Sequence, residues 1–458
     1  MPDIVFSTAT TIARAIREKQ VSVLEVLEAH LAHIARHNPR LNAIVTLDEE
    51  GARQRARAAD DALARGEIWG PLHGVPLTLK DVHSVARMRT TAGFEPLAGY
   101  VPTKDGTVAA RLRSAGAIIL GKTNVPALAA DFQTQNLIFG RTNNPWNLNR
   151  TPGGSSGGAA AAVAAGLVPL EIGSDIGGSI RIPAHFCGVY GLKPTEHRVS
   201  VAGHLPDLPG SPRGVRIMGV VGPLARDIGD LELAFRIIAG ADGRDTDVPP
   251  VPLRVEDPPP FRELSVAWTP TFPGVPAARD VREAMADLAA ELARQGSRVE
   301  KCLPEVDFAA QRALFSELVG YVVNVFQPKA EGAGPVSLAS YLKALDQRDS
   351  FILAWEHFFD DWDVLLCPAA MTTAFEHHPT ETPFTIGGEQ VRYWEMISYC
   401  CPFNLTGHPA VVLPLAQDGD GLPIGVQIAG RRWGEERLLA IARTLSDVTR
   451  RYQRPPGY

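Results

Sequence analysis

The chain has 458 residues, of which 45% are hydrophobic and 21% charged, and its formal net charge is −6. This composition is typical of a globular protein with a large core, and it argues against a nucleic-acid partner, which requires a clustered basic face. There is no run of about 18 apolar residues and no basic region followed by an apolar stretch at the amino terminus, so we expect a cytoplasmic protein without a membrane span. The five cysteines contain no C-x-x-C pair, which argues against a disulfide framework and against a cysteine zinc site.

The amino-terminal part is predicted to contain two helices and one strand. The residues SVLE at 22–25 form a capping box that begins a helix, and we expect Asn38-Pro39 to end it. A strand is predicted over 41–46 and a second helix over 49–65, which Gly66 stops.

Helices and strands continue to alternate through the rest of the chain. The middle contains a helix over 107–116, a strand over 117–120, a helix over 157–165 and a strand over 167–172. Six prolines between 248 and 260 indicate an extended surface crossing, with an interdomain hinge as the alternative. Beyond them we expect strands over 264–268, 410–414 and 424–428, the last two paired, and helices over 278–295, 311–326 and 434–452. Alternation of this kind favours an α/β protein.

Two loops rich in glycine and serine carry the chemistry, at 153–158 (GGSSGG) and 173–181 (GSDIGGSIR). Glycines allow successive backbone amides to turn toward one point, where they stabilise a developing oxyanion. Ser179 follows two such glycines and is therefore the candidate nucleophile. A plain tight turn is the alternative, and a phosphate-binding loop is disfavoured because no G-x-x-x-x-G-K-[ST] occurs.

The nucleophile needs a base, and the sequence offers two kinds. Histidines are available, among them His185 six residues after Ser179, but no G-x-S-x-G elbow surrounds this serine. Lys80 follows the apolar run 75–79, and burial there would favour its neutral, proton-accepting form. Taken from the residues alone, both choices remain open.

Short motifs extend along the whole chain. They are GVP at 74–76, KD at 80–81, GKTN at 121–124, NNPW at 143–146, GGSSGG at 153–158, GSDIGGSIRIPA at 173–184, FCGVYGLKPT at 186–195, GPLAR at 222–226 and PIGVQ at 423–427. Together these motifs resemble the amidase signature family. The resemblance covers about residues 5–450, is weakest over 255–390, and makes a chance match very improbable.

The resemblance implies a Ser–cisSer–Lys triad made of Ser179 as nucleophile, Ser155 as the bridging serine and Lys80 as the base. It also implies that the amides of Ile176, Gly177, Gly178 and Ser179 form the oxyanion hole. We expect supporting roles for Gly154, Ser156, Asp175 and Arg181.

The family further implies one α/β/α domain, with a large mixed central sheet covered by helices on both faces. Residues 1–458 would form this single domain. Its parts are the amino-terminal helices 5–66, the signature core 70–245, the proline-rich crossing 248–260, the variable substrate-side region 261–400 and the closing strands and helix 401–458.

The expected function is hydrolysis of a carboxylic amide C–N bond in a small molecule, through a seryl acyl-enzyme and without a metal or organic cofactor. Aryl amides, esters and carbamates are possible further substrates, and we expect a monomer or homodimer. The candidates for substrate contact are Phe132, Gln133, Phe315, Trp355, Tyr393 and Trp394, and for each of them core packing is the favoured alternative.

Three alternatives remain from the sequence. The chain could be the glutaminase-like subunit of a tRNA-dependent amidotransferase, which would need a protein partner, or a catalytically idle binding protein. A metal hydrolase is the weakest alternative, because the acid and histidine cluster 376–378 lacks the spacing of H-E-x-x-H.

Overall fold

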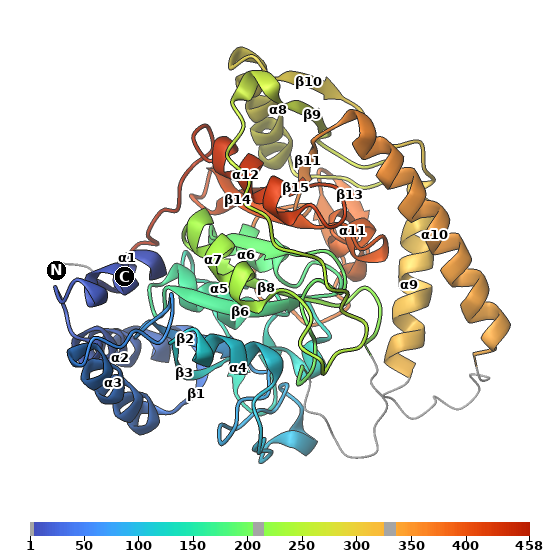
Figure 1. The fold of residues 1–458 in the computed structure, drawn as a ribbon. Helices are drawn as coiled ribbons and strands as arrows, with labels where there is room; N and C mark the ends of the chain where they lie inside the picture. The colour runs from blue at the N-terminus through green and yellow to red at the C-terminus, as the bar shows by residue number, and fades with distance from the viewer. Residues whose placement is uncertain (1–3, 205–214, 325–335) are drawn as a thin grey trace.

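A large mixed β-sheet forms the centre of the molecule in the computed structural model, which describes residues 4–204, 215–324 and 336–458. In these residues the sheet has eleven strands in the order β1-β3-β2-β6-β8-β7-β14-β15-β11-β9-β10 (Figure 1). Two parallel groups, β3-β2-β6 and β11-β9-β10, are separated by antiparallel strands, and β1 also pairs antiparallel with β3. The predicted mixed sheet is confirmed.

The strands of this sheet are β1 (Ile44–Leu47), β2 (Pro76–Lys80), β3 (Ile118–Thr123), β6 (Leu170–Asp175), β7 (Tyr190–Lys193), β8 (Val220–Ala225), β9 (Ser265–Trp268), β10 (Arg298–Lys301), β11 (Val364–Pro368), β14 (Ala410–Gln417) and β15 (Pro423–Ala429). Two small hairpins lie outside it, β4 (Gln135–Asn136) with β5 (Gly140–Arg141) and β12 (Phe384–Ile386) with β13 (Glu389–Val391).

Helices cover both faces of the sheet, as expected for an α/β/α sandwich. They are α1 (Ala9–Arg17), α2 (Val23–Leu41), α3 (Glu49–Ala64), α4 (Thr107–Ser114), α5 (Gly157–Ala164), α6 (Arg181–Cys187), α7 (Ile228–Ile238), α8 (Arg279–Arg294), α9 (Phe308–Asn324), α10 (Leu338–Asp361), α11 (Cys401–Leu405) and α12 (Glu435–Leu445). The helices α5 and α6 pack together against the sheet, α4 and α12 both pack against α7, and the long helices α9 and α10 lie at one side (Figure 1).

The helix α5 consists of glycine, alanine and one valine, and all of its residues are buried. Small side chains allow it to approach the strands beneath it closely, and it packs against β2, β3 and β6. Because Ser155 and Ser156 immediately precede α5, this packing fixes the first glycine-serine loop above the end of β2.

Most of the predicted elements are present, although some of their limits differ. The capping box at Ser22 is confirmed, but the predicted end of its helix at Asn38-Pro39 is wrong. The helix continues through Pro39 to Leu41, because the backbone N–H of Asn42 closes the last turn on the carbonyl of Asn38 at 2.7 Å.

The carboxyl-terminal helices were located less well than the strands. The pairing of β14 with β15 is confirmed, whereas α12 ends at Leu445, seven residues before the predicted 452. The helix expected over 311–326 is present as Phe308–Asn324, and its last two predicted positions lie outside the described residues. Residues 248–260 contain neither helix nor strand, as expected for a crossing.

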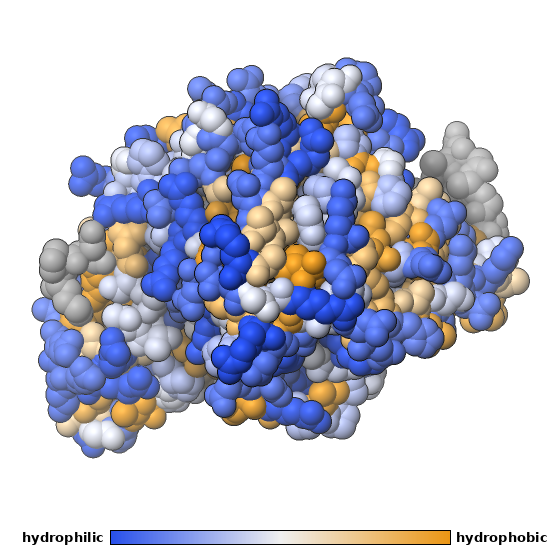
Figure 2. Space-filling model, turned by 90° about the horizontal axis from the view of Figure 1, so that it is seen from above, coloured by the Kyte–Doolittle hydropathy of each residue, from blue (hydrophilic) through white to orange (hydrophobic). Residues whose placement is uncertain are grey.

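In the described residues, no helix is both long and apolar enough to cross a bilayer. Seen from above, the molecule is mostly hydrophilic, and apolar residues show through in small groups (Figure 2). The carboxyl terminus lies beside α1 (Figure 1). The guanidinium of Arg454 lies 4.0 Å from the centroid of the Phe6 ring, so the carboxyl-terminal segment contacts the amino-terminal part of the chain.

Candidate active site

Lys80 lies at the carboxyl end of β2 with no solvent exposure. Its Nζ donates hydrogen bonds to Ser155 Oγ at 2.7 Å and to Ser174 Oγ at 3.0 Å, and it contacts the carbonyl oxygen of Ser174 at 3.3 Å. The structure therefore brings together the two residues that the sequence proposed as base and bridge.

Burial changes the chemistry of this lysine. Loss of solvent disfavours the ammonium form and lowers the pKa of Lys80 to about 7, although the nearby carboxyl groups of Glu171 and Asp175 act in the opposite direction. A lysine with such a pKa is neutral in a substantial fraction of molecules at neutral pH. It can therefore accept a proton from Ser155.

The loop that carries Ser155 is tightly confined. The peptide bond between Gly154 and Ser155 is cis. A Cβ atom on Gly154 would lie 2.8–3.0 Å from backbone atoms of residues 131–133, so only glycine fits here without displacing that segment. The position of Ser155 is thus set by backbone packing as well as by Lys80.

Ser156 connects the two glycine-serine loops. Its backbone N–H donates to the carbonyl of Ser179 at 3.1 Å, and its hydroxyl donates to the carbonyl of Ser174 at 3.2 Å. The supporting role expected for Ser156 agrees with this geometry.

Ser179 is half-buried in the turn between β6 and α6. Its hydroxyl makes no hydrogen bond to Ser155 or to any other described residue, so the second contact of the expected relay is not made in this structure. Hydrogen bonds of this kind often form only when substrate is bound. The link from Ser156 to the Ser179 carbonyl nevertheless holds the two loops together.

Asp175 and Arg181 shape the turn around Ser179. Asp175 accepts hydrogen bonds from the backbone amides of Gly178 at 2.8 Å and Ile180 at 3.0 Å, and it forms a fully buried ion pair with Arg181 at 2.9 Å. Burial alone would raise the pKa of Asp175, but the Arg181 guanidinium and these amides hold it below its ordinary value. The carboxylate therefore stays ionised and organises the turn.

The amides expected in the oxyanion hole do not behave alike. The N–H of Gly178 is directed to Asp175, so it is occupied inside the turn, which differs from the expectation that it belongs to the hole. In the described part of the chain, the N–H groups of Ile176, Gly177 and Ser179 have no hydrogen-bond acceptor. These three amides remain available to an oxyanion. Gly178 has a φ of +108°, a conformation that favours glycine.

Four further residues belong to this site and were not singled out from the sequence. Ser174 contacts Lys80 directly, while Asn404 and Gln427 accept hydrogen bonds from the Arg181 guanidinium, the latter at 2.6 Å. Glu171 lies on β6 near Lys80. Ser174 and Glu171 stand in or beside the second signature loop, so their spacing was a usable signal. Asn404 lies on α11, more than 200 positions after Arg181 in the sequence, and no local sequence pattern indicates its role.

Several candidates for substrate contact gather around the two loops. The ring of Phe315 would lie 3.3 Å from a Cβ on Gly177, which places it against the oxyanion turn. Phe132 belongs to the segment that packs on Gly154, and its ring stacks on that of Tyr393 with centroids 4.2 Å apart. Gln133 donates to the Tyr393 hydroxyl at 3.0 Å, and Trp394 meets Phe132 edge-on at 5.8 Å.

Trp355 differs from these residues. It lies on α10, is fully buried and packs against Phe359 of the same helix and Phe403 of α11. Trp355 is therefore a core residue, as in the alternative interpretation, and it does not lie with the other candidates for substrate contact at the two glycine-serine loops.

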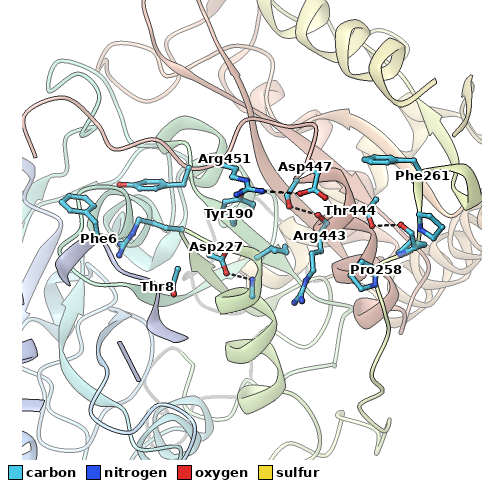
Figure 3. A pocket seen from close by; sticks show the side chains of 17 residues that line it. Phe6, Thr8, Tyr190, Asp227, Pro258, Phe261, Arg443, Thr444, Asp447 and Arg451 are labelled. Atoms are coloured by element: carbon cyan, nitrogen blue, oxygen red, sulfur yellow. Dashed lines mark hydrogen bonds and ion pairs between the residues drawn. The ribbon is translucent and has the colours of Figure 1, made fainter. Parts of the chain in front are cut away.

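A cavity of about 770 Å³ lies elsewhere, between the start of α7, the prolines at 258–260 and the end of α12 (Figure 3). Its charged side chains include Arg443, Asp447 and Asp227, and Asp227 caps α7 by accepting from the N–H of Gly229 at 2.8 Å. None of the predicted catalytic, oxyanion or substrate residues lines this cavity. The candidate active site is therefore separate from it.

Comparisons with known proteins agree with the fold and the motifs. A family model described as Amidase matches residues 25–331 and 330–439. The A subunit of glutamyl-tRNA(Gln) amidotransferase from Roseiflexus castenholzii (strain DSM 13941 / HLO8) is 35% identical over 97% of each chain. Among solved structures, a bacterial aryl acylamidase of the amidase signature family has a TM-score of 0.85 at 26% identity, and 6-aminohexanoate cyclic dimer hydrolase complexed with substrate has 0.82 at 28%, each over 99% of both chains.

The fold and these similarities define the class of protein as an enzyme of the amidase type. More specifically, this chain belongs to the amidase signature family, as its motifs suggested.

Proposed function

We propose that this chain cleaves a carboxylic amide C–N bond through an acyl-enzyme on Ser179. The observation that carries the proposal is the 2.7 Å hydrogen bond from the buried Lys80 to Ser155, made by an amine whose pKa is lowered to about 7. A neutral lysine next to a hydroxyl is an arrangement that can activate a serine without histidine.

In the acylation step, Ser179 Oγ forms a bond to the carbonyl carbon of the amide. Its proton passes to Ser155, and the proton of Ser155 passes to Lys80. The negative charge on the former carbonyl oxygen is stabilised by the amides of Ile176, Gly177 and Ser179. The C–N bond then breaks as the amine takes the proton back from Lys80 through Ser155.

In the deacylation step, water replaces the amine. Lys80 and Ser155 remove a proton from the water as its oxygen attacks the acyl carbon, and the same amides stabilise the second oxyanion. The bond to Ser179 Oγ breaks when this oxygen regains the proton. Esters and carbamates form comparable tetrahedral intermediates and are proposed as further substrates.

The side chains near the loops favour substrates with an apolar or aromatic part. Phe132, Tyr393 and Trp394 form one aromatic group beside Gly154, and Phe315 lies beside Gly177. Such rings bury apolar surface and stack on planar groups. The solved aryl acylamidase supports this choice of substrate class.

A second candidate function is that of an amidotransferase component that works with a protein partner. Its support is the 35% identity over 97% of each chain to a protein named as the A subunit of glutamyl-tRNA(Gln) amidotransferase. By identity to curated relatives, this candidate is the better supported of the two. Both candidates use the same amide-cleaving site, so they differ in substrate and partner.

The test compares the purified chain with a Ser179→Ala variant on a panel of acyl anilides, aliphatic amides including glutamine, esters and carbamates. Turnover of anilides or esters that is lost in the variant supports the first candidate. Activity confined to glutamine supports the second. A chain that turns over no member of the panel and does not react with a fluorophosphonate at Ser179 is a binding protein, and the proposal is then wrong.

A further inference from the structure

Glu171 is a buried acid that the mechanism described above does not use. It lies on β6 with no solvent exposure, directly opposite Thr78 of β2. Lys80 comes two residues after Thr78 in the same strand, so its side chain leaves the sheet on the same face as that of Glu171. The strands β2, β3 and β6 lie side by side (Figure 1).

Thr123 of β3 joins the two residues. It is the register partner of Lys80, and its hydroxyl donates to Glu171 Oε1 at 2.5 Å. The other carboxyl oxygen, Oε2, is buried and has no hydrogen-bond partner among the described residues. The acid is therefore fixed beside Lys80 but only half-satisfied.

The other charged and titratable groups around this pair are already accounted for. They are Asp175, paired with Arg181 at 2.9 Å, Asp81, paired with Lys122 at 3.3 Å, and His83 and His204, whose pKa values are lowered by burial so that both rings are neutral. Glu171 has no ion pair in the described part of the chain. Glu171 is thus a carboxyl group near Lys80 that can share a proton with the lysine.

Burial raises the pKa of Glu171 well above its ordinary value, while the charges of Lys80 and Lys122 act to lower it. With one proton between them, Lys80 and Glu171 can exist as neutral amine and neutral acid, or as ammonium and carboxylate. Only the first arrangement leaves a base for Ser155.

We propose that Glu171 is a positioning residue that acts through Lys80, and that its carboxyl group sets the pH at which Lys80 becomes a base. The inference rests on the proposed function, because it concerns the same lysine. A carboxylate at this place holds a proton on Lys80, and a neutral group of the same shape does not.

The test is a Glu171→Gln variant, whose side chain has the same shape but cannot become a carboxylate. The rate of inactivation by a fluorophosphonate is measured from pH 5 to 9, together with mapping of the labelled residue. We expect the midpoint of the acid limb to fall by about one pH unit, the lower end of the effect of a neighbouring charge. At a fixed pH on that limb, the variant then reacts about tenfold faster than wild type.

Two further variants make the test independent of how well this one folds. Thr123→Val removes the donor that stabilises the ionised carboxylate, so it also shifts the midpoint to lower pH, by a smaller amount. The matched control is Glu435→Gln on α12, another fully buried acid with a raised pKa, whose Oε1 accepts from the N–H of Thr195 at 2.7 Å. This control leaves the midpoint unchanged.

The outcomes separate this inference from the function it depends on. Suppose that wild type is labelled at Ser179 and that Glu171→Gln and Thr123→Val have the same pH midpoint as wild type. This result overturns the role of Glu171 but not the proposed function. A uniform loss of rate in Glu171→Gln without a shift does the same, because it indicates a merely structural role. Absence of labelling at Ser179 in wild type overturns the proposed function and this inference together.

Discussion

Lys80 and Lys193 are both fully buried, and burial lowers the pKa of each to about 7. What distinguishes them is the group that each ammonium contacts. Lys80 donates to Ser155 at 2.7 Å, whereas Lys193 donates to the carbonyl of Pro194 at 2.8 Å. A lowered pKa makes a lysine able to accept a proton. A hydroxyl in contact with the lysine is also needed, because the hydroxyl supplies that proton.

This difference yields a prediction for the pair. Lys80→Met should reduce the second-order rate constant for fluorophosphonate labelling by about 10²–10⁴, the usual contribution of acid–base assistance. Lys193→Met should leave that rate within a few-fold of wild type. Rapid-mixing labelling assays, with circular dichroism to verify the fold, measure both. Equal losses in the two variants would remove the geometric assignment of Lys80.

A second prediction concerns pH. Since the reactive form of Lys80 is neutral and its pKa is about 7, the labelling rate of wild type should rise with pH and level off above about pH 8. Below the midpoint it should fall about tenfold for each pH unit, because each unit reduces the neutral fraction tenfold. A rate that is flat from pH 5 to 9 would contradict a lysine base.

Among the elements, the turn between β6 and α6 depends most on one ion pair. Arg181 contacts Asp175, Asn404 and Gln427, so it connects the turn to α11 and β15. Arg181→Met should lower the free energy of unfolding by about 3–5 kcal/mol, because it leaves the buried carboxylate of Asp175 without its counter-charge. Urea denaturation followed by tryptophan fluorescence measures this loss.

The control for this prediction removes both charges. Asp175→Asn combined with Arg181→Met leaves no unpaired ion, so the double variant should lose less stability than the sum of its two single variants. Additive losses would mean that the pair is not energetically coupled. Labelling of Ser179 should be impaired in all three variants, because Asp175 also holds the amides of Gly178 and Ile180.

The elements also show what the sequence could and could not predict. The strand β6 was located from its mostly apolar run. Ser179 was singled out by the glycines before it and Lys80 by the apolar run before it, whereas Ser155 was singled out only through the resemblance to the amidase signature family. The helix α10 (Leu338–Asp361) and the strand β11 (Val364–Pro368) were not predicted. α10 has few buried positions over its 24 residues, so it shows only a weak apolar period, and its place is decided by packing against α9.

The site shows the same limit. The use of the Gly178 amide by Asp175 could not be seen in a pattern, because it depends on how the turn closes in three dimensions. Likewise, Phe132 contacts Tyr393 and Trp394 across about 260 positions of the chain, and no local spacing in the sequence predicts such a contact.

At the scale of the whole molecule, Arg226 connects parts of the chain that are distant in sequence. Its guanidinium donates to the carbonyls of Val163 and Val168 at 2.8 Å each, and to those of Val5 at 3.0 Å and Ser7 at 2.9 Å. It therefore ties the amino-terminal segment to the end of α5 and the approach to β6. Arg443 also lines the cavity of Figure 3, but it is half-exposed and pairs with Glu232.

For these two arginines we predict an effect on the free energy of unfolding and none on the labelling of Ser179. Arg226→Met should lower the free energy of unfolding by about 3 kcal/mol or more. The carbonyls of Val5, Ser7 and Val168 lose the Arg226 donor, and a buried carbonyl left without a donor costs about 1–3 kcal/mol, whereas the carbonyl of Val163 keeps the N–H of Gly166. Arg443→Met removes a surface ion pair and should cost about 0–1 kcal/mol. Both should label at Ser179 at the wild-type rate at 25 °C, since neither contacts the two glycine-serine loops. Denaturation midpoints and labelling rates measured on the same samples decide the matter. Equal stability of the two variants would show that the amino-terminal segment is held by other contacts.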